Sequence, residues 1–148
     1  MQRFLIWTAA LTVVFAIGVA AQANLTAEGH AMLMKANGQA AQATNKALGS
    51  GSVADAKAGV ATLRTNYTNL LAFYTAKKKD DAVALIKGAL TSFDEVDKQL
   101  SAATPDTMAA QAAFKMGFQG SCGGCHKQYR DGDGKTTPYS FKAGSGLP

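Results

Sequence analysis

Apolar residues recur every three to four positions along the chain after residue 24. Short polar or glycine-rich stretches interrupt them near 49–51, 77–81 and 101–106. This spacing predicts amphipathic helices, and no stretch alternates as a strand does. The predicted helices cover residues 25–48, 52–79, 80–100 and 105–130. Because the connections between them are short, we expect an all-α fold, an antiparallel up-down-up-down four-helix bundle.

The sequence also predicts how the helices begin and which residues face inward. Ser52 and Asp55 form a variant of the capping box. Thr104 and Pro105 predict the start of the fourth helix, with Thr104 as the cap and Pro105 as the first helical residue. In such a bundle, the starts of helices one and three and the ends of helices two and four meet at one pole. The expected inner stripe of the first helix is Leu25, Met32, Ala36, Ala40, Ala43 and Ala47.

The chain before the bundle has the three parts of a secretory signal peptide. Arg3 precedes an uncharged stretch over 4–21, and Ala21-Gln22-Ala23 supplies a small-residue cleavage site. We therefore expect a signal peptide at 1–23, a four-helix domain at 24–130 and an irregular tail, rich in glycine and proline, at 131–148. Cleavage predicts an exported, periplasmic protein with no stable membrane span, and an uncleaved anchor is the alternative.

Composition narrows the classes of function. The 148 residues carry a net charge of +5 and include two Cys and two His. Apolar residues are too plentiful for a disordered chain, and two Cys are too few for a disulfide-stapled miniprotein. No long basic run is present, so nucleic acid is not an expected partner. No set of nucleophile, base and acid stands out, and we therefore expect no enzyme.

The chemistry is concentrated near the end of the fourth predicted helix. Cys122, Cys125 and His126 form C-x-x-C-H, the attachment motif of c-type haem. On a helix these positions lie on one face, so that two thiols can bond a porphyrin edge while the imidazole reaches the iron. The motif predicts one covalent haem c and accounts for both cysteines. A thiol redox site, a clipped metal ion and a structural disulfide are the alternatives.

Residues 114–130, FKMGFQGSCGGCHKQYR, resemble the C-terminal helix of class II c-type cytochromes, the family of cytochrome c′ and its low-spin relatives. Members of that family are four-helix bundles with the haem bound at one pole. The resemblance implies that His126 is the proximal iron ligand and that Cys122 and Cys125 hold the haem. It also places Arg130 near a haem propionate, whereas a solvated charge at the helix end is the alternative reading of Arg130.

The first helix carries the candidates for the sixth iron position. Its sequence from His30 to Gly38 is similar to the R-x-x-x-M-K-x-x-G pattern of the low-spin family members, with His30 in place of the Arg. The resemblance makes Met34 the candidate distal ligand, while Met32 and His30 are its rivals. Met32 and Met34 lie about 200° apart on a helix, so both cannot face the iron.

Two functions are expected, depending on whether a side chain occupies the sixth coordination position of the iron. With Met34 bound, the chain is expected to be a periplasmic cytochrome that transfers single electrons between redox partners. With that position open, it is a five-coordinate protein of the cytochrome c′ kind that binds nitric oxide or carbon monoxide. Basic residues at 77–79 and Lys127 would favour an acidic redox partner, or else only solvate the helix ends. Family members often pair, which leaves a homodimer open, although no second apolar face stands out.

Overall fold

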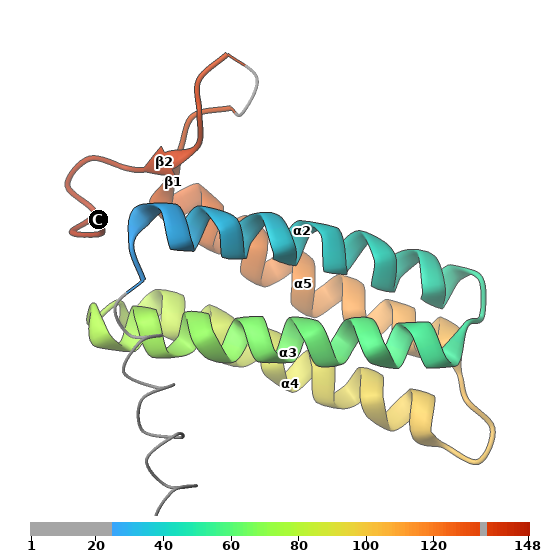
Figure 1. Cartoon of the computed structure of the whole chain (residues 1–148). Coiled ribbons are helices and arrows are strands. Elements are labelled where there is room, and N and C mark those ends of the chain that lie inside the picture. Colours follow the sequence, from blue (N-terminus) through green and yellow to red (C-terminus); the bar gives the residue numbers. More distant parts are fainter. Residues whose placement is uncertain (1–24, 134–135) are drawn as a thin grey trace, which may run out of the picture.

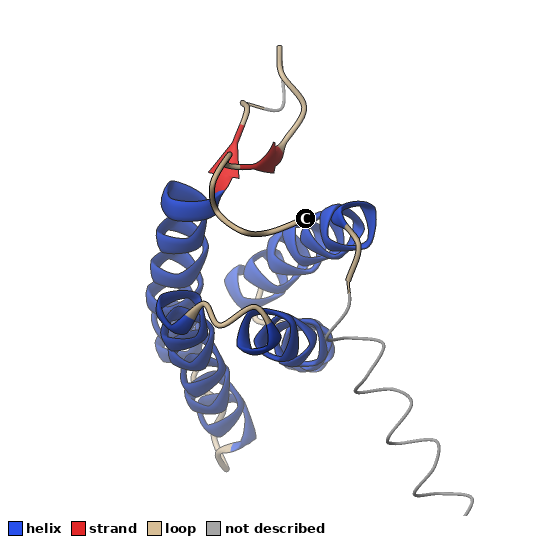
Figure 2. Ribbon diagram, turned by 90° about the vertical axis from the view of Figure 1, so that its left-hand side faces the viewer, coloured by secondary structure: helices blue, strands red, loops and turns tan. Residues whose placement is uncertain are grey.

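The four predicted helices are present and pack into one bundle. The computed structural model describes residues 25–133 and 136–148, so the expected signal peptide at 1–23 lies outside the described part. The helices are α2 (Ala27–Gly49), α3 (Val53–Ala76), α4 (Asp80–Ser101) and α5 (Thr107–Tyr129). Consecutive helices run in opposite directions and pack side by side (Figures 1 and 2). The expected all-α, antiparallel four-helix bundle is therefore confirmed.

Local chemistry sets the helix ends, though not always through the expected residue. Thr26 caps α2, where its side-chain oxygen accepts a hydrogen bond from the backbone N–H of Gly29. The start of α5 differs from the prediction: Asp106, not Thr104, is the cap, and its carboxylate accepts from the N–H of Ala109 at 2.9 Å. A carboxylate near the helix N-terminus also interacts favourably with the helix dipole, which a hydroxyl does less well.

The capping box predicted at the start of α3 does not form in its usual way. The Ser52 hydroxyl donates to the Asp55 carboxylate at 2.6 Å, and it makes no hydrogen bond to a backbone N–H. The other predicted boundary, between α3 and α4, lies where it was expected. There Lys78 has a positive φ of 54°, so a lysine occupies the left-handed position at the turn that glycine more often takes.

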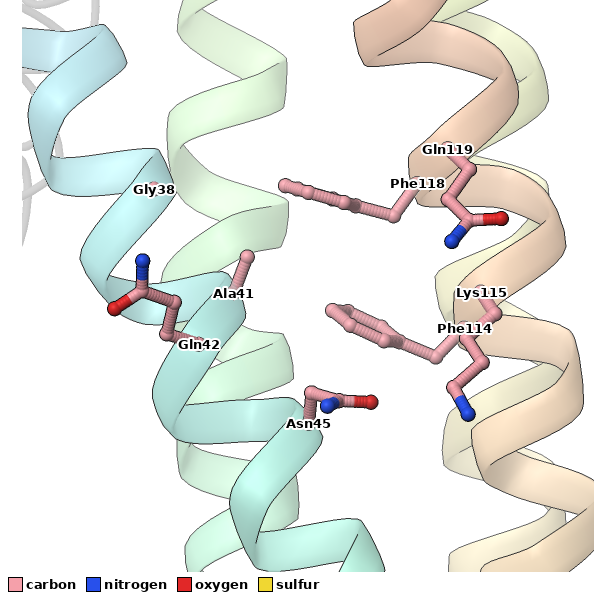
Figure 3. A pocket seen from close by; sticks show the side chains of 8 residues that line it. All are labelled: Gly38, Ala41, Gln42, Asn45, Phe114, Lys115, Phe118 and Gln119. Carbon is pink, nitrogen blue, oxygen red and sulfur yellow. The ribbon is translucent and has the colours of Figure 1, made fainter.

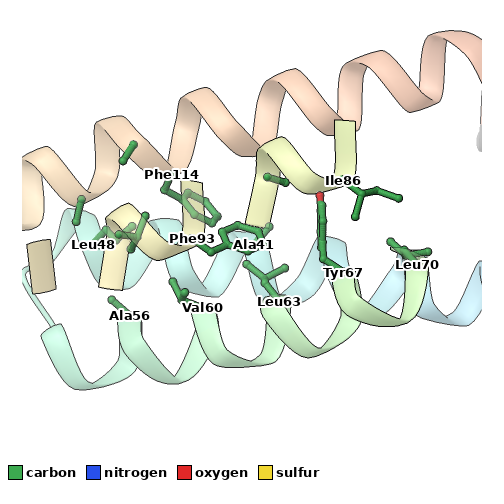
Figure 4. Packing of buried hydrophobic residues seen from close by; sticks show 14 of the residues in the cluster. Ala41, Leu48, Ala56, Val60, Leu63, Tyr67, Leu70, Ile86, Phe93 and Phe114 are labelled. Atoms are coloured by element: carbon green, nitrogen blue, oxygen red, sulfur yellow. The ribbon is translucent and has the colours of Figure 1, made fainter. Parts of the chain in front are cut away.

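The core runs along the whole bundle between the four helices (Figure 4). Its largest fully buried side chains come from α3 and α4 and include Phe73, Phe93 and Leu63. Two close contacts set the spacing of neighbouring helices. A Cβ on Gly59 would lie 2.2 Å from Oγ1 of Thr44, and one on Gly117 would lie 2.1 Å from Cβ of Ser92. The small residues therefore let α2 approach α3 and α4 approach α5.

The inner face of α2 differs from the predicted stripe. Met32 is 62% exposed and Ala43 is also exposed, so both predictions are wrong. The buried residues of α2 are His30, Asn37, Ala41, Thr44, Ala47 and Leu48. Three of these six are polar, which is why a pattern of apolar residues did not locate the face. The Thr44 hydroxyl is satisfied within the helix, since it donates to the carbonyl of Ala40 at 2.8 Å.

The segment after α5 contains a short antiparallel ribbon, and its other described residues belong to no helix or strand. Strand β1 (Arg130–Asp131) pairs with β2 (Ser140–Phe141), with Arg130 opposite Phe141. Phe141 and Leu147 are partly buried and pack against the core, so apolar contacts attach residues 140–147 to the bundle. No helix within the described residues is long and apolar enough to span a membrane.

Candidate functional site

The helix ends that were expected to meet do share one pole, at the left of Figure 1. The Nε2 atom of His30 in α2 lies 3.2 Å from the hydroxyl oxygen of Tyr74 in α3. Tyr129 of α5 donates a hydrogen bond to Asp81 of α4. These contacts join the start of α2 to the end of α3, and the start of α4 to the end of α5. We call this end of the bundle the site pole.

Cys122, Cys125 and His126 lie on the last two turns of α5 at the site pole. All three side chains are half-buried, and both cysteines are free thiols. On its other side this part of α5 lies close to α4, because a Cβ on Gly124 would be 2.8 Å from Leu85. The helix therefore holds the two thiols and the imidazole in the i, i+3, i+4 arrangement on which the motif depends.

The environment of the two thiols argues against a redox-active pair. Burial raises the pKa of Cys122, and burial together with the neighbouring Cys122 and Asp81 raises the pKa of Cys125 to about 11. Catalytic thiols of the C-x-x-C type instead have a lowered pKa, because the thiolate is the reacting form. Both cysteines are thus protonated thiols at neutral pH, and they lack the activation that disulfide exchange requires.

A metal ion bound by the two cysteines is also poorly supported. Structural zinc requires four ligands, drawn mostly from Cys and His. Across residues 25–133 and 136–148, no three His, Cys, Asp or Glu side chains are grouped so that they could hold an ion. A haem needs less from the chain, because the porphyrin supplies four nitrogen ligands and the protein adds one or two.

Tyr67 is a site residue that the sequence did not single out. Its hydroxyl lies 3.2 Å from Sγ of Cys122 and 3.3 Å from Oγ of Ser121, while its ring packs edge-on against Phe93 at 5.2 Å. Burial, followed by the neighbouring Cys122, raises the pKa of Tyr67, so the phenol stays neutral. In the sequence Tyr67 is one of several apolar positions of its helix, and nothing there indicates that it touches the motif.

His126 and Arg130 lie one turn apart at the end of α5. Burial and the nearby Arg130 charge both lower the pKa of His126, which favours the neutral imidazole that binds a metal. The Arg130 guanidinium lies over the Tyr139 ring at 4.3 Å, a cation–π contact with the chain after β1. Arg130 is thus held beside the motif by Tyr139, rather than extended freely into solvent.

The structure separates the three candidates on α2. Met34 is partly buried and packs against the core, whereas Met32 points to solvent. His30 is 8% exposed and lies among Phe73, Tyr74 and the C-terminal Phe141. Burial, helped by the charge of His126, lowers the pKa of His30 to about 4. His30 is therefore a neutral imidazole with its Nε2 atom engaged by Tyr74, and Met34 is the candidate that faces inward without a polar partner.

Tyr129 closes the pole between α4 and α5. It is 7% exposed, its ring lies 5.7 Å from that of Tyr74, and its hydroxyl bonds to Asp81. Burial and the Asp81 carboxylate raise the pKa of Tyr129 to about 12. The same hydrogen bond is the main cause of the lowered pKa of Asp81. The sequence could not indicate this pair, since a contact 48 positions along the chain leaves no local signal.

Helices α2 and α5 make fewer contacts with each other than the consecutive helices do. A pocket of about 400 Å³ opens there, and Figure 3 shows the rings of Phe114 and Phe118 pointing from α5 across it towards α2. Its wall includes Gly38, which is one turn beyond Met34, and Phe118, which is one turn before Cys122. None of Met34, Cys122, Cys125 and His126 lines it, so the pocket is separate from the motif.

One buried side-chain oxygen of α2 has no hydrogen-bond partner. Oδ1 of Asn37 is buried without a hydrogen-bond partner, in a residue that is 4% exposed and lies next to Gly38 in the chain. Leaving a buried acceptor unpaired costs about 1–3 kcal/mol, so such an atom indicates that a partner is missing. The two thiols and the neutral His126 fit a haem, with Cys122, Cys125 and His126 as the residues that would hold it. The unpaired oxygen of Asn37 needs a hydrogen-bond donor, which a haem with ionised propionates does not supply.

Comparison with known proteins adds no relative: no family model, curated protein or solved structure matches the chain. The resemblance to class II cytochromes therefore depends on the motif helix and on the sequence of α2 alone.

Proposed function

We propose that the protein is an exported, periplasmic c-type cytochrome of the class II kind, which carries one haem and transfers single electrons between redox partners. One observation carries the proposal: Cys122, Cys125 and His126 lie together on α5 at the site pole as two protonated thiols and a neutral imidazole. This is the form in which the three residues serve haem attachment and iron binding, and it does not suit thiol exchange.

Each residue at the pole has a role in this proposal. Cys122 and Cys125 would hold the haem through thioether bonds, each formed by addition of the S–H group across a vinyl double bond of the haem, and His126 would bind the iron through a ring nitrogen. Tyr67 orients Cys122 through its hydroxyl. Arg130, held over Tyr139, offers a guanidinium to a propionate carboxylate. The bound haem supplies a metal that gains and loses one electron, with a potential set by its axial ligands and by the polarity around it.

Met34 is the proposed second axial ligand. It is the inward-facing methionine of α2, and a thioether ligand favours a low-spin carrier with a raised potential. The alternative is a five-coordinate protein that binds nitric oxide or carbon monoxide. The departure of α2 from the family pattern, with His30 in place of the Arg, supports the alternative.

The proposed partner is an acidic redox protein. Lys77, Lys78 and Lys79 end α3 at the site pole, and Lys127 follows the motif directly. Lys142 adds a further positive charge there, because its Nζ atom donates to the backbone carbonyl of Lys127 at 2.7 Å. Basic side chains around the site would speed the encounter with a negatively charged partner, and added salt would slow it.

Absorbance spectra of the exported protein test this function. We expect the oxidised and reduced protein to show low-spin haem bands, with no change when carbon monoxide is added to the reduced form. Met34→Ala should convert the spectrum to one that responds to carbon monoxide, whereas Met32→Ala should leave it unchanged. A native protein that takes up carbon monoxide at once would overturn the electron carrier in favour of the gas-binding alternative.

A further inference from the structure

The ribbon that follows α5 turns back over the site pole. The backbone N–H of Lys142 donates to the carbonyl of Tyr129 at 2.9 Å, so the chain after β2 is attached to the last turn of α5. From there the chain crosses the end of the bundle in Figure 2. Leu147 packs against the core, and a Cβ on Gly146 would lie 3.3 Å from Nζ of Lys79, at the end of α3. The ribbon thus joins one side of the pole to the other.

Phe141 is the residue of this ribbon that reaches the site. Its ring centroid lies 4.5 Å from that of His30, and it stacks on Phe73 at 6.4 Å with an angle of 18° between the planes. Phe73 and Tyr74 of α3 contact His30 as well. His30 is therefore enclosed by three aromatic rings, of which only Phe141 comes from outside the helices.

We propose that residues 139–147 form a cover over the site pole and that Phe141 is its positioning residue. Phe141 fixes His30 against α3 and keeps water away from the motif. The inference rests on the proposed function only where it concerns the haem. The apolar surroundings of a metal site control solvent access and thereby its reduction potential. The cover would accordingly raise the potential of the bound haem and slow the entry of external reagents into the pole.

The cover is held lightly enough to open. Its ribbon has only two residues in each strand, and its last turn depends on glycines with positive φ, 76° at Gly144 and 67° at Gly146. Segments with few buried contacts open locally far more often than the core does. Access to His30 should therefore be limited by opening of this segment and not by unfolding of the bundle.

The rate at which His30 is chemically modified shows how well the cover protects the site pole, and this measurement needs no haem. The folded, exported protein is treated with diethyl pyrocarbonate, and the rate at His30 is followed by peptide mass spectrometry. Phe141→Ala should increase this rate by at least about tenfold, since it removes one wall around the ring. Phe141→Leu should restore most of the protection. Met108→Ala is the control and should leave the His30 rate unchanged, because Met108 is 83% exposed and lies at the start of α5, away from the site pole.

The outcomes separate this inference from the function on which it partly rests. An unchanged His30 rate in Phe141→Ala overturns the cover, and circular dichroism shows whether the helices of each variant are intact. Given a faster rate, a lower midpoint potential in Phe141→Ala supports the role at the haem, while an unchanged potential overturns that role. A chain that carries no haem contradicts the proposed function, and the His30 rates still decide whether Phe141 covers the pole.

Discussion

The two halves of the bundle are built from the same helices and have different interiors. Towards the connections at 50–52 and 102–106, the buried residues are mostly aliphatic, and they include Leu48, Ala56, Val60, Val96 and Leu100. At the site pole the interior holds His30, Tyr74 and Tyr129, with two half-buried thiols beside them. Buried polar groups cost stability unless they are satisfied, and most of those at the pole are hydrogen-bonded. Both halves bury apolar side chains, Phe73 and Ile86 among them at the pole, and the pole differs in the polar groups that it buries as well.

The prediction with the largest expected effect tests whether haem attachment at the site pole can be removed without loss of the fold. Replacement of both cysteines, Cys122→Ala and Cys125→Ala, should abolish covalent haem completely, because no other thiol is present. The helices should remain, since the two residues only flank the core. Absorbance after denaturation and circular dichroism of the same sample check both statements. If the double variant retained covalent haem, the assigned attachment would be wrong.

The second prediction removes packing in the middle of the core. Phe93 is fully buried and contacts Tyr67 and Phe114. Phe93→Ala should lower the free energy of unfolding by about 3–5 kcal/mol, as truncation of a buried aromatic ring does. The haem spectrum of the folded variant should be that of the parent. Urea titration gives the first value, and a shifted spectrum would show that core and site are not separable in this way.

The third prediction concerns how the stability of the fold depends on pH through His30 at the site pole. The pKa of His30 falls from the usual 6.5 to about 4 in the folded chain. Because the unfolded chain then binds more protons, His30 contributes stability above pH 6.5 that is lost as the pH falls towards 4. The maximum loss is about 3 kcal/mol, at about 1.4 kcal/mol per pKa unit. Urea titrations of the haem-free double cysteine variant between pH 7 and 4 measure it, and His30→Gln should flatten the profile. A profile with the same slope in His30→Gln would assign the loss to other groups.

The smallest expected effect lies at the far end of the bundle. Asp106→Ala should destabilise the protein by about 1 kcal/mol, because the N–H of Ala109 loses its side-chain acceptor. Thr104→Ala is the matched control and should change stability little, since Thr104 lies outside the helix. Thermal unfolding of the two variants compares them. Equal losses would restore Thr104 as a capping residue.

Helical periodicity predicted the number, order and approximate ends of the helices, and their order predicted which helix ends meet at the pole where C-x-x-C-H lies. Periodicity and the motif each involve residues that are close together in the chain, and such short-range patterns can be recognised in a sequence. The inner face of α2 was missed because Asn37 and Thr44 occupy core positions that apolar patterning assigns to alanines. The contacts of Tyr67 with Cys122 and of Phe141 with His30 join residues 55 and 111 positions apart, so only the folded chain reveals them.

The intact mass of the exported protein tests the central claim most directly. We expect a chain that begins near Asn24 and whose mass, measured under denaturing conditions, exceeds that of the polypeptide by one haem. A denatured chain with the mass of the polypeptide alone would contradict the account, since C-x-x-C-H at the site pole would then hold no covalent cofactor.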